Sequence, residues 1–278
     1  MVRTSAVAGH FYPKDPGELS ALIEKCLEGI APDPRRCEAA VVPHAGLIYS
    51  GQCAGAVFGR LVLPRTVVVL CPNHTGTCRS PGASLWRSGV FDTPLGPVSI
   101  DESFAVALEQ ACDLVVHDPA AHRFEHAIEV ELPFLIARSP GTAIVPIVIA
   151  WSDWLRSERL AAALAETVAA RRSVAPGSDV LLLASSDMSH YEGAAEADRK
   201  DRMALAAIER VDGRALLEVC ERERISMCGR APVAVVLEAA RRLGASDAEV
   251  VDYRHSGWVS GRDDDVVSYA GVLIGRRG

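Results

Sequence analysis

Three short apolar runs constrain the fold of this chain most, because each ends in a polar loop that carries a histidine. The runs AAVV, VVVL and VLLLA are rich in Val and Leu and are typical of strands buried inside a sheet. They lead into loops that contain His44, then His74, then Asp187 and His190. The stretches between these runs read as helices, and alternation of strand and helix predicts an α/β fold.

The alternation extends along the whole chain. Asp15-Pro16-Gly17-Glu18 is typical of a helix start, with Asp as the N-cap and Pro in the first turn. No Gly/Ser-rich or Pro-rich linker divides the sequence, so we predict one domain over residues 1–278 with a three-layer α/β/α architecture and a mixed, mostly parallel sheet. The predicted helices cover 15–27, 50–61, 102–111, 153–170, two within 194–222, and 230–243, and the predicted strands are 39–42, 66–74, 142–149, 179–190, 249–254 and 266–275.

Composition excludes several classes of protein. The net charge of −7 argues against general nucleic-acid binding, since the chain does not neutralise phosphates in bulk. No apolar run approaches the roughly 18 residues of a membrane span, and the start MVRTSAVAGHFYP lacks the apolar core of a signal peptide. We therefore expect a cytoplasmic protein with no membrane contact, whose 8 cysteines are reduced.

The three loops are expected to meet. In open α/β sheets, ligands bind beyond the carboxyl ends of the strands, where His44, His74 and His190 would then share one rim with Asp187. Histidine is both a common metal ligand and an acid–base group. The alternative is that each histidine is an ordinary hydrogen-bonded loop residue, and spacing alone does not decide between the two interpretations.

A second histidine cluster contains the pattern H-x-x-E-H at His122, Glu125 and His126. On a helix, the two histidines would share a face and hold zinc, with Glu125 as the general base of a hydrolase. The residues before His122 are not a convincing helix start, and Pro133 interrupts soon afterwards. The alternative is a loop and a short helix whose polar groups cap their neighbours.

One cysteine has the sequence context of a reactive thiol. Cys228 precedes Gly229 and a strongly helical stretch, and a helix N-terminus lowers the pKa of a thiol. Arg230 adds positive charge beside it. Thiolate is the metal-binding form, so Cys228 is a candidate ligand; the alternative is a small buried residue in a tight loop.

Seven motifs together carry a resemblance to a known family. They are AVAGHFYP, PHAGLIYSG, CPNH, FEHAIEVELPF, SSDMSHY, MCGR and VSYAG. In this order, and over essentially the whole chain, the sequence resembles the Memo family, whose bacterial members are called AmmeMemoRadiSam system protein B. That family is similar in fold to the class III extradiol dioxygenases, which are non-haem iron enzymes that open catechol rings.

The resemblance implies a metal site and its ligands. In the dioxygenases two histidines and a carboxylate hold Fe(II), with positions left open for substrate and O₂. The Memo family has cysteine in place of the carboxylate, which implies His44, His74 and Cys228 as ligands here. Fe(II) is the expected metal, with copper as an alternative and zinc less favoured, because thiolate also suits Cu(I) and Zn.

The resemblance also implies the residues around the metal. His190 matches the acid–base histidine of the dioxygenases, and Asp187, on the same loop, is expected to orient His190 or a bound water in catalysis. His126 is expected to stabilise developing negative charge. The residues expected to line the cleft or contact the substrate are Phe11, Tyr12, Tyr49, Glu125 and Arg230.

The predicted function is therefore that of a metal-dependent, dioxygenase-like oxidoreductase. Its expected substrate is an aromatic or phenolic small molecule or a peptide side chain, and the family implies a radical-SAM protein and an AMMECR-type protein as partners. Two alternatives are a non-catalytic protein that binds a peptide or partner on the same fold, and the zinc hydrolase described above.

Overall fold

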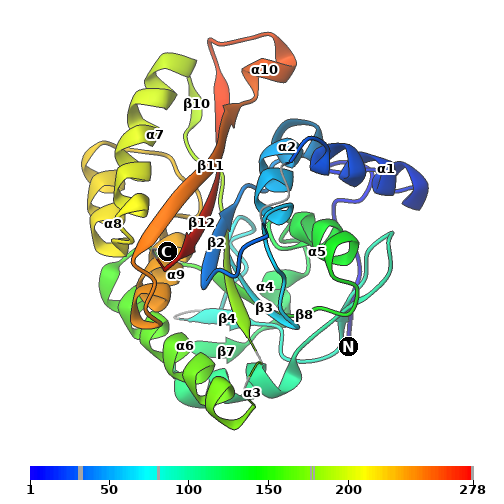
Figure 1. The fold of residues 1–278 in the computed structure, drawn as a ribbon, viewed down its shortest axis with the longest axis vertical. Coiled ribbons are helices and arrows are strands. Elements are labelled where there is room, and N and C mark those ends of the chain that lie inside the picture. The colour runs from blue at the N-terminus through cyan, green and yellow to red at the C-terminus, as the bar shows by residue number, and fades with distance from the viewer. Residues whose placement is uncertain (31–33, 80–81, 176, 178, 277–278) are drawn as a thin grey trace.

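A mixed sheet of nine strands runs through the molecule (Figure 1). The structure is a computed structural model that describes residues 1–30, 34–79, 82–175, 177 and 179–276. In order across the sheet, the strands are β10 (His190–Glu192), β12 (Val266–Gly275), β2 (Ala39–Val42), β9 (Val180–Ser185), β3 (Thr66–Pro72), β8 (Ala143–Ile149), β4 (Ala83–Leu85) and β7 (Val115–His117), with β11 (Asp247–His255) paired to β12.

The centre of this sheet is parallel and its flanks are mixed. Strands β2, β9, β3 and β8 are parallel to one another, whereas β12 runs antiparallel to β2 and β4 runs antiparallel to β8. Every residue of β2, β3 and β9 is buried. Strands that are apolar on both faces need a layer of helices on each side, so the unbroken Val and Leu runs dictate a three-layer fold.

Two groups of helices supply these layers (Figure 1). On one face lie α1 (Pro16–Leu27), α2 (Leu47–Phe58) and α5 (Leu132–Arg138), which contact one another. On the other face α9 (Arg230–Arg242) packs on β9, β3 and β2, and it is covered by α6 (Trp154–Val174) and α8 (Gly213–Arg222), with α7 (Ala194–Glu209) and α3 (Glu102–Ala111) beside them. The three-layer α/β/α prediction is confirmed.

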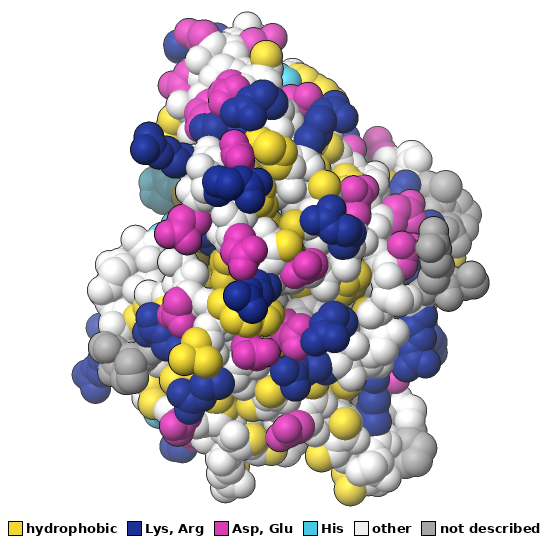
Figure 2. Space-filling view, turned by 90° about the vertical axis from the view of Figure 1, so that its left-hand side faces the viewer, with side chains coloured by type: hydrophobic (Ala, Val, Ile, Leu, Met, Phe, Trp, Pro, Cys, Tyr) yellow, Lys and Arg dark blue, Asp and Glu magenta, His cyan; other side chains and the backbone are white. Residues whose placement is uncertain are grey.

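The surface over α7 and α8 carries charges of both signs (Figure 2). Many of them are local pairs, such as Arg202–Asp198 at 2.8 Å and Arg214–Glu218 at 2.9 Å, each spaced four residues apart on its helix. Such exposed pairs contribute little to stability, so these helices are held mainly by their apolar faces. No helix among the described residues is long and apolar enough to cross a membrane.

The structure departs from the predicted elements in several places. The strand predicted at 179–190 ends at Ser185, and His190 begins the separate strand β10. The helix predicted at 50–61 begins at Leu47, directly after the PHAG loop, and ends at Phe58. The stretch after residue 117, read as a loop, holds α4 (Pro119–His122), the 3₁₀ turn η1 (Glu129–Glu131) and α5. Strands of two or three residues were not predicted, because they are too short to show periodicity: β1 (Val2–Arg3), β4, β5 (Val90–Phe91), β6 (Val98–Ser99), β7 and β10.

Candidate functional site

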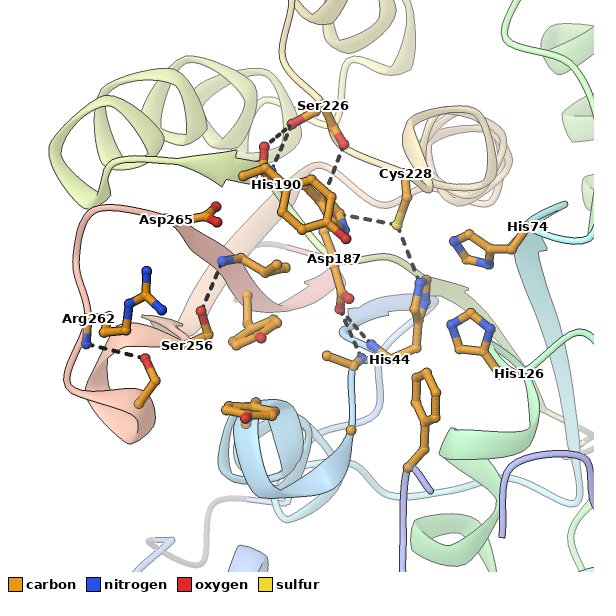
Figure 3. A pocket seen from close by; sticks show the side chains of 18 residues that line it. His44, His74, His126, Asp187, His190, Ser226, Cys228, Ser256, Arg262 and Asp265 are labelled. Atoms are coloured by element: carbon orange, nitrogen blue, oxygen red, sulfur yellow. Dashed lines mark hydrogen bonds between the residues drawn. The ribbon is translucent and has the colours of Figure 1, made fainter. Parts of the chain in front are cut away.

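Three imidazoles converge beyond the carboxyl ends of the central strands (Figure 3). His44 follows β2, His74 follows β3, and His126 lies between α4 and η1. One nitrogen of each ring lies within 4.8 Å of the corresponding nitrogens of the other two. The rings of His74 and His126 are stacked at 4.6 Å, and that of His44 stands edge-on to both. We call these three residues the histidine cluster.

Glu125 orients two members of the cluster. Its carboxylate accepts hydrogen bonds from His74 Nδ1 at 2.9 Å and from the backbone N–H of His74 at 2.7 Å. His126 Nδ1 lies 3.4 Å from the same carboxylate. Burial of Glu125 opposes ionisation, but the hydrogen bond and charge of His74, the backbone N–H of Ala127 and the charge of His126 together outweigh it and lower the pKa of the carboxyl. With Nδ1 of His74 used as a donor, its Nε2 keeps a free lone pair for the centre of the cluster.

His44 is fully buried and is held on two sides. Its backbone N–H donates to Asp187 Oδ1 at 2.8 Å, and its ring Nδ1 lies 2.8 Å from Ser185 Oγ. Burial, and then the neighbouring His126 and His74 rings, lower the pKa of His44 well below its usual value. The ring is therefore neutral, which is the state that binds metals.

Cys228 adds a sulfur to one edge of the cluster. Its Sγ lies 3.4 Å from His44 Nε2 and 3.7 Å from the carbonyl oxygen of Asp187. The prediction of a lowered thiol pKa is wrong for the protein alone: burial, and then the charge of Asp187, raise the pKa of Cys228 far above its usual value. Desolvation outweighs the partial charge of the α9 terminus, and a thiolate would require a cation beside it.

The residues present fit a bound metal ion. Two donors that bind one ion at about 2.0–2.3 Å lie about 3–4 Å apart, which is the separation of Cys228 Sγ from His44 Nε2. Metal-binding histidines normally use their second nitrogen for a buried hydrogen bond, as His44 and His74 do here. Among the described residues, the three whose donor atoms all lie within 4.8 Å of one another are His44, His74 and His126. Cys228 lies close to His44 but is not part of this group, so the structure offers two candidates for a third ligand, His126 and Cys228.

A cavity of about 690 Å³ opens from the histidine cluster. Figure 3 shows the cluster at one end and Arg262 and Asp265 at the other. His190, on β10, lies on its wall and donates from Nδ1 to the carbonyl oxygen of Ser226 at 3.1 Å, which leaves Nε2 free as a proton acceptor. The lining side chains that carry aromatic rings other than imidazole are Phe11, Tyr49, Tyr191 and Tyr269.

Asp187 lines this cavity but has a different contact from the one predicted. Its Oδ1 accepts from the backbone N–H groups of His44 and Ala45, so it fixes the loop after β2 rather than the ring of His190. Burial raises the pKa of Asp187 to about 6, although these hydrogen bonds oppose the shift. The Asp187 carboxyl therefore holds the backbone of His44 in place.

Three other expected residues lie away from the cavity. Tyr12 is buried and its hydroxyl donates to Glu129, so it does not line the cleft as predicted. Phe11 does line the cavity, and its ring centroid lies 4.6 Å from that of His126. Arg230 lines a separate cavity of about 430 Å³. Glu125 acts beneath the histidines rather than in the cavity wall.

The pattern H-x-x-E-H does not form a zinc site. Helix α4 ends at His122, whose ring is buried against Trp86 and Phe91 and has Nε2 2.9 Å from the carbonyl oxygen of Ser84. His122 is therefore used in the core, while His126 joins the histidine cluster. The hydrolase interpretation fails because the helix is too short to bring both rings to one face.

Sequence reasoning did not single out the far wall of the cavity. The residues of this wall are Ser226, Ser256, Arg262 and Asp265, from loops with no apolar periodicity, and Ser260, the last residue of the short helix α10 (Gly257–Ser260). Only the polar run GRDDD indicates an exposed loop. Tyr191 lies at the rim, 79% exposed, with a left-handed backbone (φ 57°) that is uncommon for a residue with a side chain. Such backbone conformations concentrate at functional sites.

Gly229 lets the Cys228 loop approach β9, and we expect Gly229→Ala to disturb it. A Cβ at this position would lie 2.5 Å from Ser186 Cβ and 2.7 Å from the carbonyl oxygen of Ser185, and neither atom moves freely. Overpacking of this kind costs about 1–3 kcal/mol of unfolding free energy, measurable by urea denaturation. The matched control is Gly193→Ala, another helix N-cap glycine with negative φ (−63°, against −94° at Gly229), where the added Cβ would lie no closer than 3.8 Å to any atom, the carbonyl oxygen of Asp263. An unchanged denaturation midpoint for Gly229→Ala would contradict the close approach.

The fold and the cluster define a class: an α/β protein with imidazoles and a thiol gathered at the carboxyl ends of parallel strands. Comparison with known proteins then assigns the family. Residues 3–273 match the family described as Memo-like protein. A MEMO1 family protein of Methanopyrus kandleri is 38% identical over 293 residues, covering 100% of both chains, and one of Aquifex aeolicus is 38% identical over 276 residues, covering 98% of this chain and 99% of that one. The chain belongs to the Memo family.

Proposed function

We propose that this protein is a metal-dependent oxidoreductase with Fe(II) as the first candidate metal, copper as the second and zinc less favoured. The observation that supports the proposal is the histidine cluster itself, in which His44 and His74 each have Nδ1 hydrogen-bonded to a buried side chain, and Nε2 of His44 lies 3.4 Å from Cys228 Sγ. His44 and His74 would hold the metal, with Cys228 or His126 as third ligand. When bound, the metal would supply redox chemistry toward O₂ and open positions for ligands.

The chain's own residues bind and deprotonate the substrate. The walls formed by Phe11, Tyr49 and Tyr269 suit an aromatic or phenolic group, from a small molecule or a peptide side chain. His190 lines the cavity, and its Nε2, which has no hydrogen bond among the described residues, takes the proton of a phenolic hydroxyl as the general base. A radical-SAM protein and an AMMECR-type protein in the cytoplasm remain the proposed partners.

A second candidate function is binding without catalysis. The exposed Tyr191 at the rim and the polar far end around Arg262 would also suit a peptide. This function predicts that peptide or partner binding survives the removal of His44, His74 and Cys228. An oxidoreductase predicts that these substitutions abolish both metal binding and turnover.

The decisive experiment is anaerobic reconstitution with Fe(II), followed by metal analysis and O₂ consumption with a panel of catechols and phenols. We expect stoichiometric metal and substrate-dependent O₂ uptake that is lost in His190→Gln. His117→Gln is the matched control, since His117 lies on β7 outside the cavity. Wild-type protein that binds no redox metal at a stoichiometric level would end the proposal.

A further inference from the structure

The hydroxyl of Ser185 lies in a buried hydrogen-bond cluster directly behind His44. Its Oγ lies 2.8 Å from His44 Nδ1, 2.9 Å from Glu131 Oε1 and 2.7 Å from the carbonyl oxygen of Ala127. A serine hydroxyl offers one hydrogen and two lone pairs. The carbonyl of Ala127 only accepts, so it takes that hydrogen. His44 Nδ1 and Glu131 Oε1 are then left to donate a hydrogen each to Oγ.

Glu131 has surroundings that suit a neutral acid. Its side chain is 0% exposed, and its Oε2 has no hydrogen-bond partner among the described residues. Burial raises the pKa of Glu131 well above its usual value, and the charge of Asp187 adds to this rise; even a hydrogen bond donated by Ser185 to the ionised form would not reverse it. Glu129, two residues earlier and equally buried, is instead paired with Arg3 and is bonded by the N–H of Ala6 at 2.8 Å. An ionised carboxylate with no such partners would be costly to bury.

We infer that Glu131 is a neutral carboxylic acid and that, with Ser185, it is a positioning residue that holds His44 in the tautomer with its hydrogen on Nδ1. The lone pair of His44 is then on Nε2, the atom that faces Cys228 Sγ at 3.4 Å. An ionised Glu131 would compete with Ala127 for the only hydrogen of Ser185 and would place a negative charge behind the histidine cluster.

The two strand-end histidines are thereby made unequal. His74 donates to the ionised carboxylate of Glu125, whereas His44 donates to a hydroxyl backed by a neutral acid. A carboxylate behind a histidine raises its basicity as a ligand, so His74 is the stronger donor of the two. This consequence for metal binding rests on the proposed function, but the protonation of Glu131 and the tautomer of His44 do not.

Infrared spectroscopy of the metal-free protein tests the neutral acid directly. At about pH 7 we expect a carboxylic-acid C=O stretching band from a buried group, since burial disfavours the charged form of a carboxyl. The band disappears in Glu131→Gln. It persists in the matched control Glu129→Gln, because Glu129 is ionised against Arg3. Absence of the band, or its persistence in Glu131→Gln, overturns the inference.

Histidine NMR of the metal-free protein and Zn²⁺ titration test the positioning role. The ring nitrogens of His44 should show the hydrogen on Nδ1, with His44→Gln assigning the signals. Ser185→Ala removes the acceptor of that hydrogen, and we expect a mixture of tautomers and about 10–100-fold weaker Zn²⁺ binding. Glu131→Gln, whose amide N–H₂ still donates to Ser185, should retain the tautomer and most of the affinity. A hydrogen on Nε2 in the wild type, or equal Zn²⁺ affinity in Ser185→Ala, contradicts the inference.

Discussion

Replacing Glu129 with glutamine is expected to lower the free energy of unfolding by about 3–5 kcal/mol, because it leaves the Arg3 guanidinium charged and unpaired inside the protein. The side chains of Arg3 and Glu129 are 1% and 0% exposed. Arg3 also donates to the carbonyl oxygens of His122 and Glu125, and therefore ties the N-terminal strand to the segment that carries His126. Urea denaturation with an unchanged slope would measure the loss.

The matched control is the same substitution in an exposed ion pair. Glu196 pairs with Arg199 on the surface of α7, and we expect Glu196→Gln to leave the denaturation midpoint essentially unchanged. Loss of the Glu129 contacts to Ala6, Val7 and Tyr12 should also loosen the segment that presents Phe11 to the ring of His126. A Glu129→Gln protein as stable as the wild type would show that this network does not hold the N-terminus.

The sequence predicted the parts of the site that depend on strand ends. His44 and His74 follow directly from buried strands β2 and β3, and parallel strands deliver their carboxyl ends to the same edge of the sheet. The three-layer fold followed from the same unbroken apolar runs, because strands buried on both faces need helices on both sides. Both predictions succeed because an unbroken apolar run is visible in a short stretch of sequence and leads directly to a strand buried on both faces.

The predictions that were wrong concern residues whose role depends on how deeply they are buried and on partners far away in the sequence. The pKa of Cys228 was predicted from its helix terminus and from Arg230, but burial dominates, and burial is a property of the whole fold. Phe11 and Tyr12 are neighbours in sequence, yet Tyr12 lies in the core because its hydroxyl donates to Glu129, a residue far away in the sequence. The role of Asp187 depended on which backbone amides lie within reach, which no spacing in the sequence records.

On the proposed function, the pH dependence of metal affinity identifies the third ligand. The thiol of Cys228 is protonated in the free protein, so its coordination releases one proton, and the logarithm of the association constant should rise by about one per pH unit. Burial lowers the pKa of His126 to about 4, so this ring is already neutral near pH 7 and would release none. We expect the proton-releasing behaviour, measured by Co²⁺ or Zn²⁺ titration at several pH values.

Three variants separate the possibilities. His74→Ala removes a ligand under either arrangement and should weaken binding by more than about 100-fold, which exceeds the effect of losing a supporting hydrogen bond. Cys228→Ser should flatten the pH dependence and remove the sulfur-to-metal absorption of the Co²⁺ form, whereas His126→Asn should retain both. The opposite pattern, with a flat pH dependence in the wild type and metal lost only from His126→Asn, would make this a three-imidazole site. A site of that kind would leave the thiol protonated beside His44, because no cation would then offset the cost of burying a thiolate.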